Sequence, residues 1–310
     1  MLKNEIKKVS IIGAGAVGCF YGTKLQKNGF DVQFQSKFLF NNHVNQLKIN
    51  SIWGNFDTNI NIHETVEKLS NNDLIIFSTK ITDFENDLNF MKHSIQKLAN
   101  KNSIILLLQN GINIEEKLQQ VFPVNPILGG LAFTCINRNN NIIDHIDYGN
   151  IKIGANLSKY NFIAKHIVEI FKKSGIETDY LRNLRLGRYE KLLWNIPFNS
   201  LSVILNCTTE KLVLEGSTKN LARNLMLEVI KIAKKDGIPL KKSMVDTMIN
   251  RTISMKPYKT SMLLDYEKGN KLEIESILKQ PINIAKSYNI KIPYIDCIYH
   301  LLSAINYKLN

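Results

Sequence analysis

Residues 8–18 read KVSIIGAGAVG, and the fold follows from this stretch more than from any other. Its mainly apolar segment, residues 9–12, predicts a buried strand, and residues 16–27 predict a helix that ends at Asn28-Gly29. Glycine suits such an end because it readily adopts the left-handed conformation that turns the chain out of a helix. A strand, a glycine turn and a helix in this order begin a βαβ unit.

The turn between that strand and helix matches the pattern G-x-G-x-x-G, as Gly13-Ala14-Gly15-Ala16-Val17-Gly18. Gly13 permits the tight turn, Gly15 lets a pyrophosphate approach the backbone, and Gly18 lets the helix pack closely on the strand. The N-terminus of the helix adds free N–H groups and the positive end of a dipole. We therefore expect residues 13–18 to bind a dinucleotide cofactor.

The second strand of the unit, residues 31–35, indicates which dinucleotide is bound. NAD enzymes of this type usually carry an acidic residue at the end of this strand, where it binds the ribose 2′-hydroxyl. This chain has Gln35-Ser36-Lys37 instead, a hydroxyl and a cation that suit a 2′-phosphate. The pattern favours NADP(H), with Lys37 as a cofactor-binding residue, although a solvated loop lysine would look the same.

The rest of the chain divides into two patterns. Up to about residue 182, strands alternate with helices, which is typical of a doubly wound parallel sheet of the Rossmann type. After that point, helical stretches follow one another with almost no strand between them. We predict an α/β fold with a Rossmann NADP-binding domain over residues 1–182 and an all-helical substrate and catalytic domain over residues 183–310. The expected strands are 73–78, 103–108, 127–135, 142–146, 150–153 and 177–181, and the expected helices are 84–98, 113–122, 161–173, 188–206, 218–235, 242–255, 272–288 and 294–309.

Composition narrows the function classes. The 310 residues include 44% apolar and 22% charged residues, as in ordinary globular proteins. No apolar run reaches the roughly 18–20 residues that span a bilayer, and the first residues lack the apolar core of a secretory signal, so we expect a cytoplasmic protein with no membrane partner. The net charge of +13 comes from scattered lysines without a basic block, which argues against a nucleic-acid partner. The four cysteines lie far apart, so neither a metal site nor a disulfide is expected.

A second set of polar residues lies in the predicted helix 188–206. Lys191, Asn195 and Asn199 recur every four residues, so they lie along one side of that helix. Their neighbours are apolar, and polar groups in such a setting usually have a partner or a ligand because leaving them unpaired costs free energy. From spacing alone, a solvated face of the helix remains an equal alternative.

The whole chain resembles the ketopantoate reductase family. Five marks carry the resemblance and occur in the family's order. They are the glycine turn, Lys80 after the third strand, Gln109-Asn110-Gly111 after the fourth, the helix with Lys191, Asn195 and Asn199, and Ser261-Met262-Leu263-x-Asp265 with Glu273 twelve residues after Ser261.

This resemblance implies a reductase that passes hydride from NADPH to the ketone of 2-dehydropantoate, forming (R)-pantoate in pantothenate biosynthesis. By position, Lys191 matches the family's proton donor, and Glu273 matches a catalytic carboxylate beside it. Asn195, Asn199 and Ser261 match substrate-binding positions, and Asn110 matches a residue that contacts cofactor and substrate. Lys80 and Cys135 match cofactor-binding positions.

Three residues depart from the family's pattern. Pro197 falls inside the catalytic helix, where a missing N–H and a steric clash predict a bend between Asn195 and Asn199. Thr209 occupies a position at which some members have another substrate-binding Asn, and Tyr189 occupies one at which Trp is common. These changes leave the reduction chemistry in place but leave the identity of the acid open.

We therefore interpret the chain as an NADP-dependent oxidoreductase for a small 2-keto acid, a monomer or homodimer, with substrate and cofactor meeting between its domains. One alternative is a related dehydrogenase for another 2-hydroxy acid or a phosphorylated polyol, which would use the cluster Arg182, Arg185 and Arg188. Another is a non-catalytic nucleotide sensor. The presence of both Lys191 and Glu273 argues against a sensor.

Overall fold

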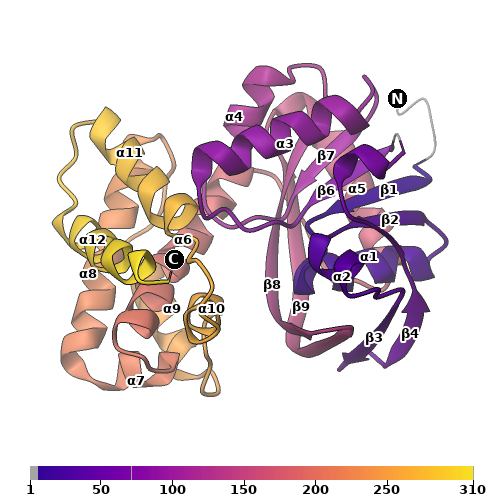
Figure 1. Ribbon diagram of the computed structural model, residues 1–310. Helices are drawn as coiled ribbons and strands as arrows, with labels where there is room; N and C mark the ends of the chain where they lie inside the picture. The colour runs from indigo at the N-terminus through magenta and orange to yellow at the C-terminus, as the bar shows by residue number, and fades with distance from the viewer. Residues whose placement is uncertain (1–5, 71, 310) are drawn as a thin grey trace. The chain divides into compact units, whose positions relative to one another are not determined.

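The structure, a computed structural model, describes residues 6–70 and 72–309. It consists of two compact units, which we call the N-terminal unit and the helical unit (Figure 1). The N-terminal unit comprises Met1–Lys80, Glu85–Gln109 and Ile114–Leu184. Arg185–Asn310 form the helical unit together with two short segments from earlier in the chain, Ile81–Phe84 and Asn110–Asn113.

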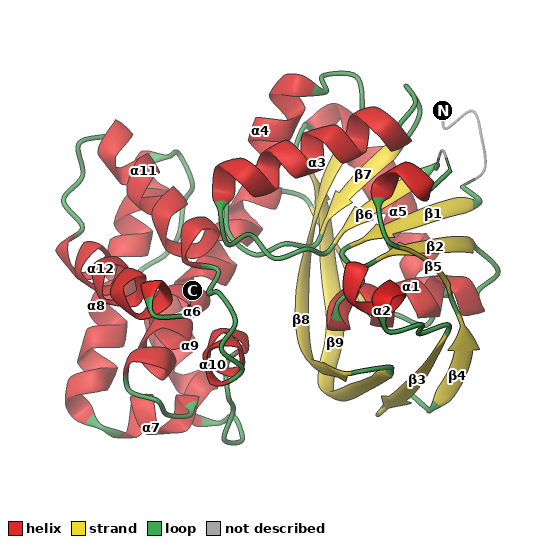
Figure 2. Ribbon diagram, viewed as in Figure 1, coloured by secondary structure: helices red, strands yellow, loops and turns green. Residues whose placement is uncertain are grey.

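A single sheet organises the N-terminal unit (Figure 2). Its strands run in the order β4-β3-β9-β8-β7-β6-β1-β2-β5, and β10 pairs with β9. The strands are β1 (Lys8–Ile12), β2 (Asp31–Gln35), β3 (Gln46–Ser51), β4 (Phe56–Asn59), β5 (Asn61–His63), β6 (Leu74–Phe77), β7 (Ile104–Leu107), β8 (Ile127–Asn139), β9 (Ile142–Ala155) and β10 (Thr178–Leu181). The consecutive pairs from β5 through β2, β1, β6 and β7 to β8 are parallel, which confirms the Rossmann-type sheet.

The strands at the centre of the sheet are apolar along their whole length because both faces are covered. Ile104–Leu107 in β7 and Leu74–Phe77 in β6 are buried at every position, as expected for parallel strands that carry helices on both sides. The helical elements of this unit are α1 (Ala16–Lys27), α2 (Lys37–Asn41), η1 (Val66–Lys68), α3 (Phe84–Leu98), α4 (Ile114–Val121), η2 (Ser158–Tyr160) and α5 (Asn161–Lys173).

The largest difference from the sequence-based expectation is the hairpin of β8 and β9. We expected three separate strands, the first ending at Cys135, but β8 continues to Asn139 and pairs with β9 in antiparallel fashion. The polar residues near position 148 are a bulge within β9, where Tyr148 and Gly149 have φ angles of 57° and 109°. The prediction that Cys135 ends a strand was therefore wrong, because Cys135 lies within β8.

The helical unit contains only helices among its described elements, which confirms the predicted fold class. They are α6 (Leu184–Ile204), α7 (Thr209–Leu214), α8 (Gly216–Lys235), α9 (Ser243–Ile253), α10 (Ser261–Glu267), the π-helical turn η3 (Glu275–Lys279), α11 (Gln280–Ser287) and α12 (Pro293–Tyr307). Helix α6 continues through Pro197 to Ile204. In the described part of the chain, no helix has the length and apolar character that a membrane crossing requires.

One apolar core holds the helical unit together. It combines Leu192, Leu193 and Ile196 of α6 with buried residues of α8, α9, α11 and α12. Ile112, from the short segment after β7, belongs to the same core and is fully buried. Burial of this side chain explains why Asn110–Asn113 packs with the helices that follow much later in the sequence.

Candidate functional site

The glycine turn joins β1 to α1 in the manner the sequence predicts. Gly13 has a φ angle of +80°, and a Cβ atom there would lie 2.4 Å from Cγ2 of Thr79. At Gly18 a Cβ atom would lie 2.2 Å from Oγ of Ser78, whose hydroxyl donates a hydrogen bond of 2.8 Å to the Gly13 carbonyl. Both glycines are therefore required by close approach of the segment that follows β6.

Gly15 differs from the other two glycines because packing does not explain it. A Cβ atom at this position would meet only the Gly13 carbonyl oxygen, at 3.9 Å. Gly15 is also the N-cap residue of α1. It has no side chain that could accept a hydrogen bond from the backbone N–H groups of the first turn, which begins with Ala16 and Val17. Open space above a helix N-terminus with free donors suits the approach of a phosphate group.

The end of β2 is tied to the same turn. The backbone carbonyl of Gln35 accepts a hydrogen bond of 2.9 Å from the Ala14 N–H, and its side-chain Oε1 accepts one of 3.3 Å from the Gly13 N–H. The Ser36 hydroxyl accepts from the Leu39 N–H at 3.3 Å, so it caps α2. Lys37 is exposed at the start of α2 and is thus available to an anion at this edge.

Lys80 and Cys135, the other two residues of the N-terminal unit that were expected to contact the cofactor, lie near β6 and in β8. Lys80 is exposed and follows the end of β6 by three residues. Cys135 is half-buried within β8, opposite Asp147 of β9. The carboxyl edge of the parallel strands, where open α/β sheets bind ligands, thus carries the glycine turn, Lys37 and Lys80.

Helix α6 of the helical unit carries the expected catalytic lysine. Asn195 and Asn199 are buried, and Lys191 is partly exposed as a whole residue although its ammonium group is buried. Burial of the ammonium group lowers the pKa of Lys191 to about 7; the charge of Arg188 acts in the same direction, and the charge of Glu273 opposes both. A lysine with this pKa can donate a proton near neutral pH.

Glu273 is the second expected catalytic residue and is almost fully buried, with 7% of its surface exposed. Its carboxylate accepts one hydrogen bond of 3.2 Å from Nδ2 of Asn110 and another of 3.3 Å from the backbone N–H of Ile81. The loops that follow β6 and β7 are therefore bound to the helical unit through this carboxylate. The structure brings together Lys191, Glu273 and Asn110, all proposed from sequence.

Ser261 and Thr209 lie in less informative positions. Ser261 is the exposed first residue of α10, while the preceding Thr260 caps that helix by accepting from the Leu263 N–H at 3.2 Å. Thr209 is fully buried at the start of α7, and its backbone N–H donates to the Tyr258 carbonyl at 3.0 Å. The described contacts do not join either side chain to Lys191.

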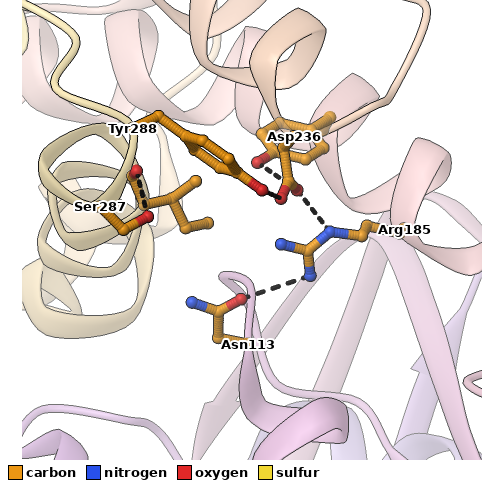
Figure 3. Close-up of polar contacts among 7 residues, drawn as sticks. Asn113, Arg185, Asp236, Ser287 and Tyr288 are labelled. Carbon is orange, nitrogen blue, oxygen red and sulfur yellow. Dashed lines mark hydrogen bonds and ion pairs between the residues drawn. The ribbon is translucent and has the colours of Figure 1, made fainter.

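Sequence reasoning missed a polar network around Asp236, at the C-cap of α8 (Figure 3). The Asp236 carboxylate accepts hydrogen bonds from Arg185 Nε at 2.5 Å, from the Tyr189 hydroxyl at 2.8 Å and from the Tyr288 hydroxyl at 3.4 Å. Nη1 of Arg185 also donates to Asn113 Oδ1 at 3.3 Å. The network links the start of α6, which carries Lys191, to the loop that carries Asn110.

Arg188 is a second residue whose importance the sequence did not reveal. The sequence suggests for it only a place in a possible phosphate-binding cluster, but in the structure its side chain is buried, with 2% exposed, one turn before Lys191. The interval of three residues could have indicated that both cations share a face of α6. Burial of the guanidinium could not be read from the sequence because it depends on distant segments.

The family model described as ketopantoate reductase PanE/ApbA matches residues 9–157, and the model of its C-terminal part matches residues 183–306. A 2-dehydropantoate 2-reductase from Nostoc sp. is 37% identical, with 97% of this chain and 95% of the relative covered. The crystal structure of 2-dehydropantoate 2-reductase from Geobacter metallireducens superimposes with a TM-score of 0.89 at 31% identity, covering 96% of this chain and 99% of the other.

A structure of D-mandelate dehydrogenase with NADH and anilino(oxo)acetate has the same fold, with a TM-score of 0.88 at 23% identity and 98% of this chain and 99% of the other covered. These similarities confirm the reductase class expected from the sequence, together with a nicotinamide dinucleotide as the cofactor of that class. The chain belongs to the ketopantoate reductase family.

Proposed function

We propose that the protein reduces 2-dehydropantoate to (R)-pantoate with NADPH, a step of pantothenate biosynthesis. The observation that carries the proposal is the environment of Lys191, whose pKa of about 7 results mainly from burial. Such a lysine suits the reduction of a ketone, because negative charge builds on the carbonyl oxygen and must be neutralised by a proton.

The residues of the glycine turn fit the proposed cofactor. Residues 13–18 would hold the pyrophosphate, because Gly15 leaves open space above the unprotected N-terminus of α1. Lys37 would bind the 2′-phosphate, and Lys80, Asn110 and Cys135 would contact other parts of the dinucleotide. Bound NADPH would supply hydride to the keto carbon.

In the helical unit, Lys191 would donate its proton to the alkoxide that forms. Glu273 would orient the ammonium group, since opposite charges attract and the carboxylate is already fixed by Asn110 and Ile81. Asn195, Asn199, Ser261 and Asn110 would donate hydrogen bonds to the hydroxyl and carboxylate groups of the substrate. Asn195 and Asn199 are buried, so an acid that left their amide groups without hydrogen bonds would bind less well.

A second candidate is the reduction of another 2-keto acid. Thr209, which stands where some family members have an Asn, favours it because its side chain is shorter and fully buried. The shared fold of a D-mandelate dehydrogenase shows that this architecture also serves a 2-hydroxy acid with an aromatic side chain. A phosphorylated polyol is a weaker candidate, since Arg185 is bound to Asp236.

We propose a cytoplasmic enzyme that draws on the NADPH of that compartment and acts as a monomer or homodimer. One solved structure with this fold, a ketopantoate reductase from Staphylococcus aureus at 21% identity, is described as dimeric. Sedimentation of the purified protein would distinguish the two states.

A substrate panel tests the proposed function. Purified protein is mixed with NADPH and either 2-dehydropantoate, phenylglyoxylate, pyruvate or a phosphorylated ketose, and the absorbance of NADPH is followed. We expect kcat/KM for 2-dehydropantoate to exceed that for every other compound by at least about a hundredfold, because a site built to bind a substrate hydroxyl rejects compounds that lack it. A higher value for phenylglyoxylate would favour the second candidate, and oxidation with no compound would favour a sensor.

A further inference from the structure

Arg138 lies close to the proposed cofactor site, and no role has been assigned to it above. It is the next-to-last residue of β8, in the N-terminal unit, and its guanidinium carbon lies 4.4 Å from the centre of the Phe38 ring. Phe38 follows Lys37 in α2, directly after the end of β2. The hairpin therefore brings a second cation to the strand end at which the sequence places the 2′-phosphate.

An electrostatic interaction also relates Arg138 to the start of α1. Burial raises the pKa of the Cys19 thiol, and the positive charge of Arg138 opposes this effect, so the two groups lie close enough to interact. Cys19 is part of the first turn of α1: its N–H donates to the Gly15 carbonyl at 2.9 Å and its thiol to the Ala14 carbonyl at 3.3 Å. Arg138 thus lies near both the glycine turn and the start of α2.

The charges around this position suit an anion. Arg138 forms no ion pair with a carboxylate of the described residues, and its one hydrogen bond there runs from Nη1 to the Asn140 carbonyl at 3.3 Å. A guanidinium has five N–H donors, so most of its donor capacity is available to a ligand. Neither does Lys37 pair with an acid in the described part of the chain.

We propose that Arg138, stacked on Phe38, forms with Lys37 the pair of cations that binds the adenosine 2′-phosphate of NADPH. This inference rests on the cofactor of the proposed function and adds a residue that determines its specificity. A planar guanidinium binds two phosphate oxygens at once, whereas a lysine provides a single point charge. The Phe38 ring fixes the plane of the guanidinium, which lowers the entropy lost when phosphate binds.

Equilibrium binding tests the inference without turnover. NADPH and NADH are titrated into wild-type protein and Arg138→Gln, and binding is followed by the fluorescence of the reduced nicotinamide. We expect the Kd for NADPH to rise about 10- to 100-fold, because a hydrogen bond to a charged group is lost, while the Kd for NADH changes less than about threefold. Competition by 2′,5′-ADP should weaken by the same factor, and competition by 5′-ADP should not.

Matched variants separate the role of Arg138 from the net charge and from folding. Lys101→Gln removes an exposed cation just before β7, at the opposite edge of the same sheet, and should leave both Kd values unchanged. Arg138→Lys keeps the charge but loses the planar fork, so NADPH should bind several-fold more weakly than to wild type but more tightly than to Arg138→Gln. Thermal unfolding of each variant shows whether it is folded. If Arg138→Gln does not fold, the weaker binding of NADPH to Arg138→Lys still tests the inference.

Two results would overturn the inference. If Arg138→Gln weakened the binding of NADPH and NADH equally, Arg138 would act on a group common to both, such as the pyrophosphate. If the affinity for NADPH did not change, Arg138 would not contact the cofactor. A failure of the proposed function would be seen in the wild-type protein itself, which would then bind neither NADPH nor NADH.

Discussion

At the scale of single residues, the proposed chemistry depends on how Lys191 is held. Burial and Arg188 both favour the neutral amine, while Glu273 favours the ammonium form. The balance leaves the group half-protonated near neutral pH, where a general acid is most effective. An exposed lysine on the same helix would keep a pKa near about 10.4 and would be a poor proton donor.

This balance predicts the pH dependence of turnover. Because Lys191 must be protonated to act as the acid, kcat/KM should be constant below pH 7 and fall about tenfold per unit above it. Glu273→Gln removes the charge that raises this pKa, so the falling limb should move to lower pH. Measurement of NADPH oxidation from pH 5.5 to 9.5 checks both curves, and a profile that is flat up to pH 9 would remove Lys191 from the role of acid.

Other residues were predicted only in part, for physical reasons. The spacing of Lys191, Asn195 and Asn199 placed them on one helix face, since the period of a helix fixes that relation locally. The bonds from Glu273 to Asn110 and Ile81 join residues separated by 163 and 192 positions. No local pattern encodes such contacts, which arise only when the whole unit packs.

At the scale of elements, regular amphipathic segments were predictable and irregular ones were not. Helices α1, α3 and α5 begin and end as the sequence indicates, because glycine and polar residues follow their apolar patterns. Short helices such as α7 and α10 escaped prediction, since so few residues show no clear period. The bulge at Tyr148 interrupted the alternation of β9 and made one strand look like two.

In the Asp236 network, one carboxylate at the end of α8 accepts hydrogen bonds from two residues of α6, Arg185 and Tyr189. Asp236→Asn would remove the negative charge beside Arg185 and replace one of the two acceptor oxygens with an NH2 donor, in a region where Asp236 has only 10% of its side chain exposed. We expect a loss of about 2–4 kcal/mol in the free energy of unfolding, and a lower kcat, because the start of α6 is no longer fixed. Urea titration and steady-state kinetics measure the two effects.

A matched control for this change is Asp246→Asn, which breaks the exposed ion pair between Asp246 and Arg223. Exposed pairs contribute at most about 1 kcal/mol, so this variant should unfold close to wild type and keep its kcat. If both variants lost the same stability, the network would have no special role in holding α6.

At the scale of the whole molecule, the proposed function assigns a different part of the chemistry to each unit. The N-terminal unit offers the glycine turn and the cations at the end of β2, and the helical unit offers Lys191, Glu273 and the buried amides. The order of strands and helices made the two patterns visible in the sequence. The assignment of Asn110–Asn113 to the helical unit was not visible, since it depends on the burial of Ile112 and the bond to Glu273.

The most direct test compares the wild-type enzyme with Lys191→Met, using 2-dehydropantoate and NADPH at pH 7 and Lys101→Met, at an exposed position, as a control. We predict that Lys191→Met lowers kcat by at least about a hundredfold while the Kd for NADPH stays within about threefold. The variant should unfold at a higher temperature than wild type, because it no longer buries a charged group. Turnover close to that of the wild type would contradict the assignment of Lys191 as the proton donor.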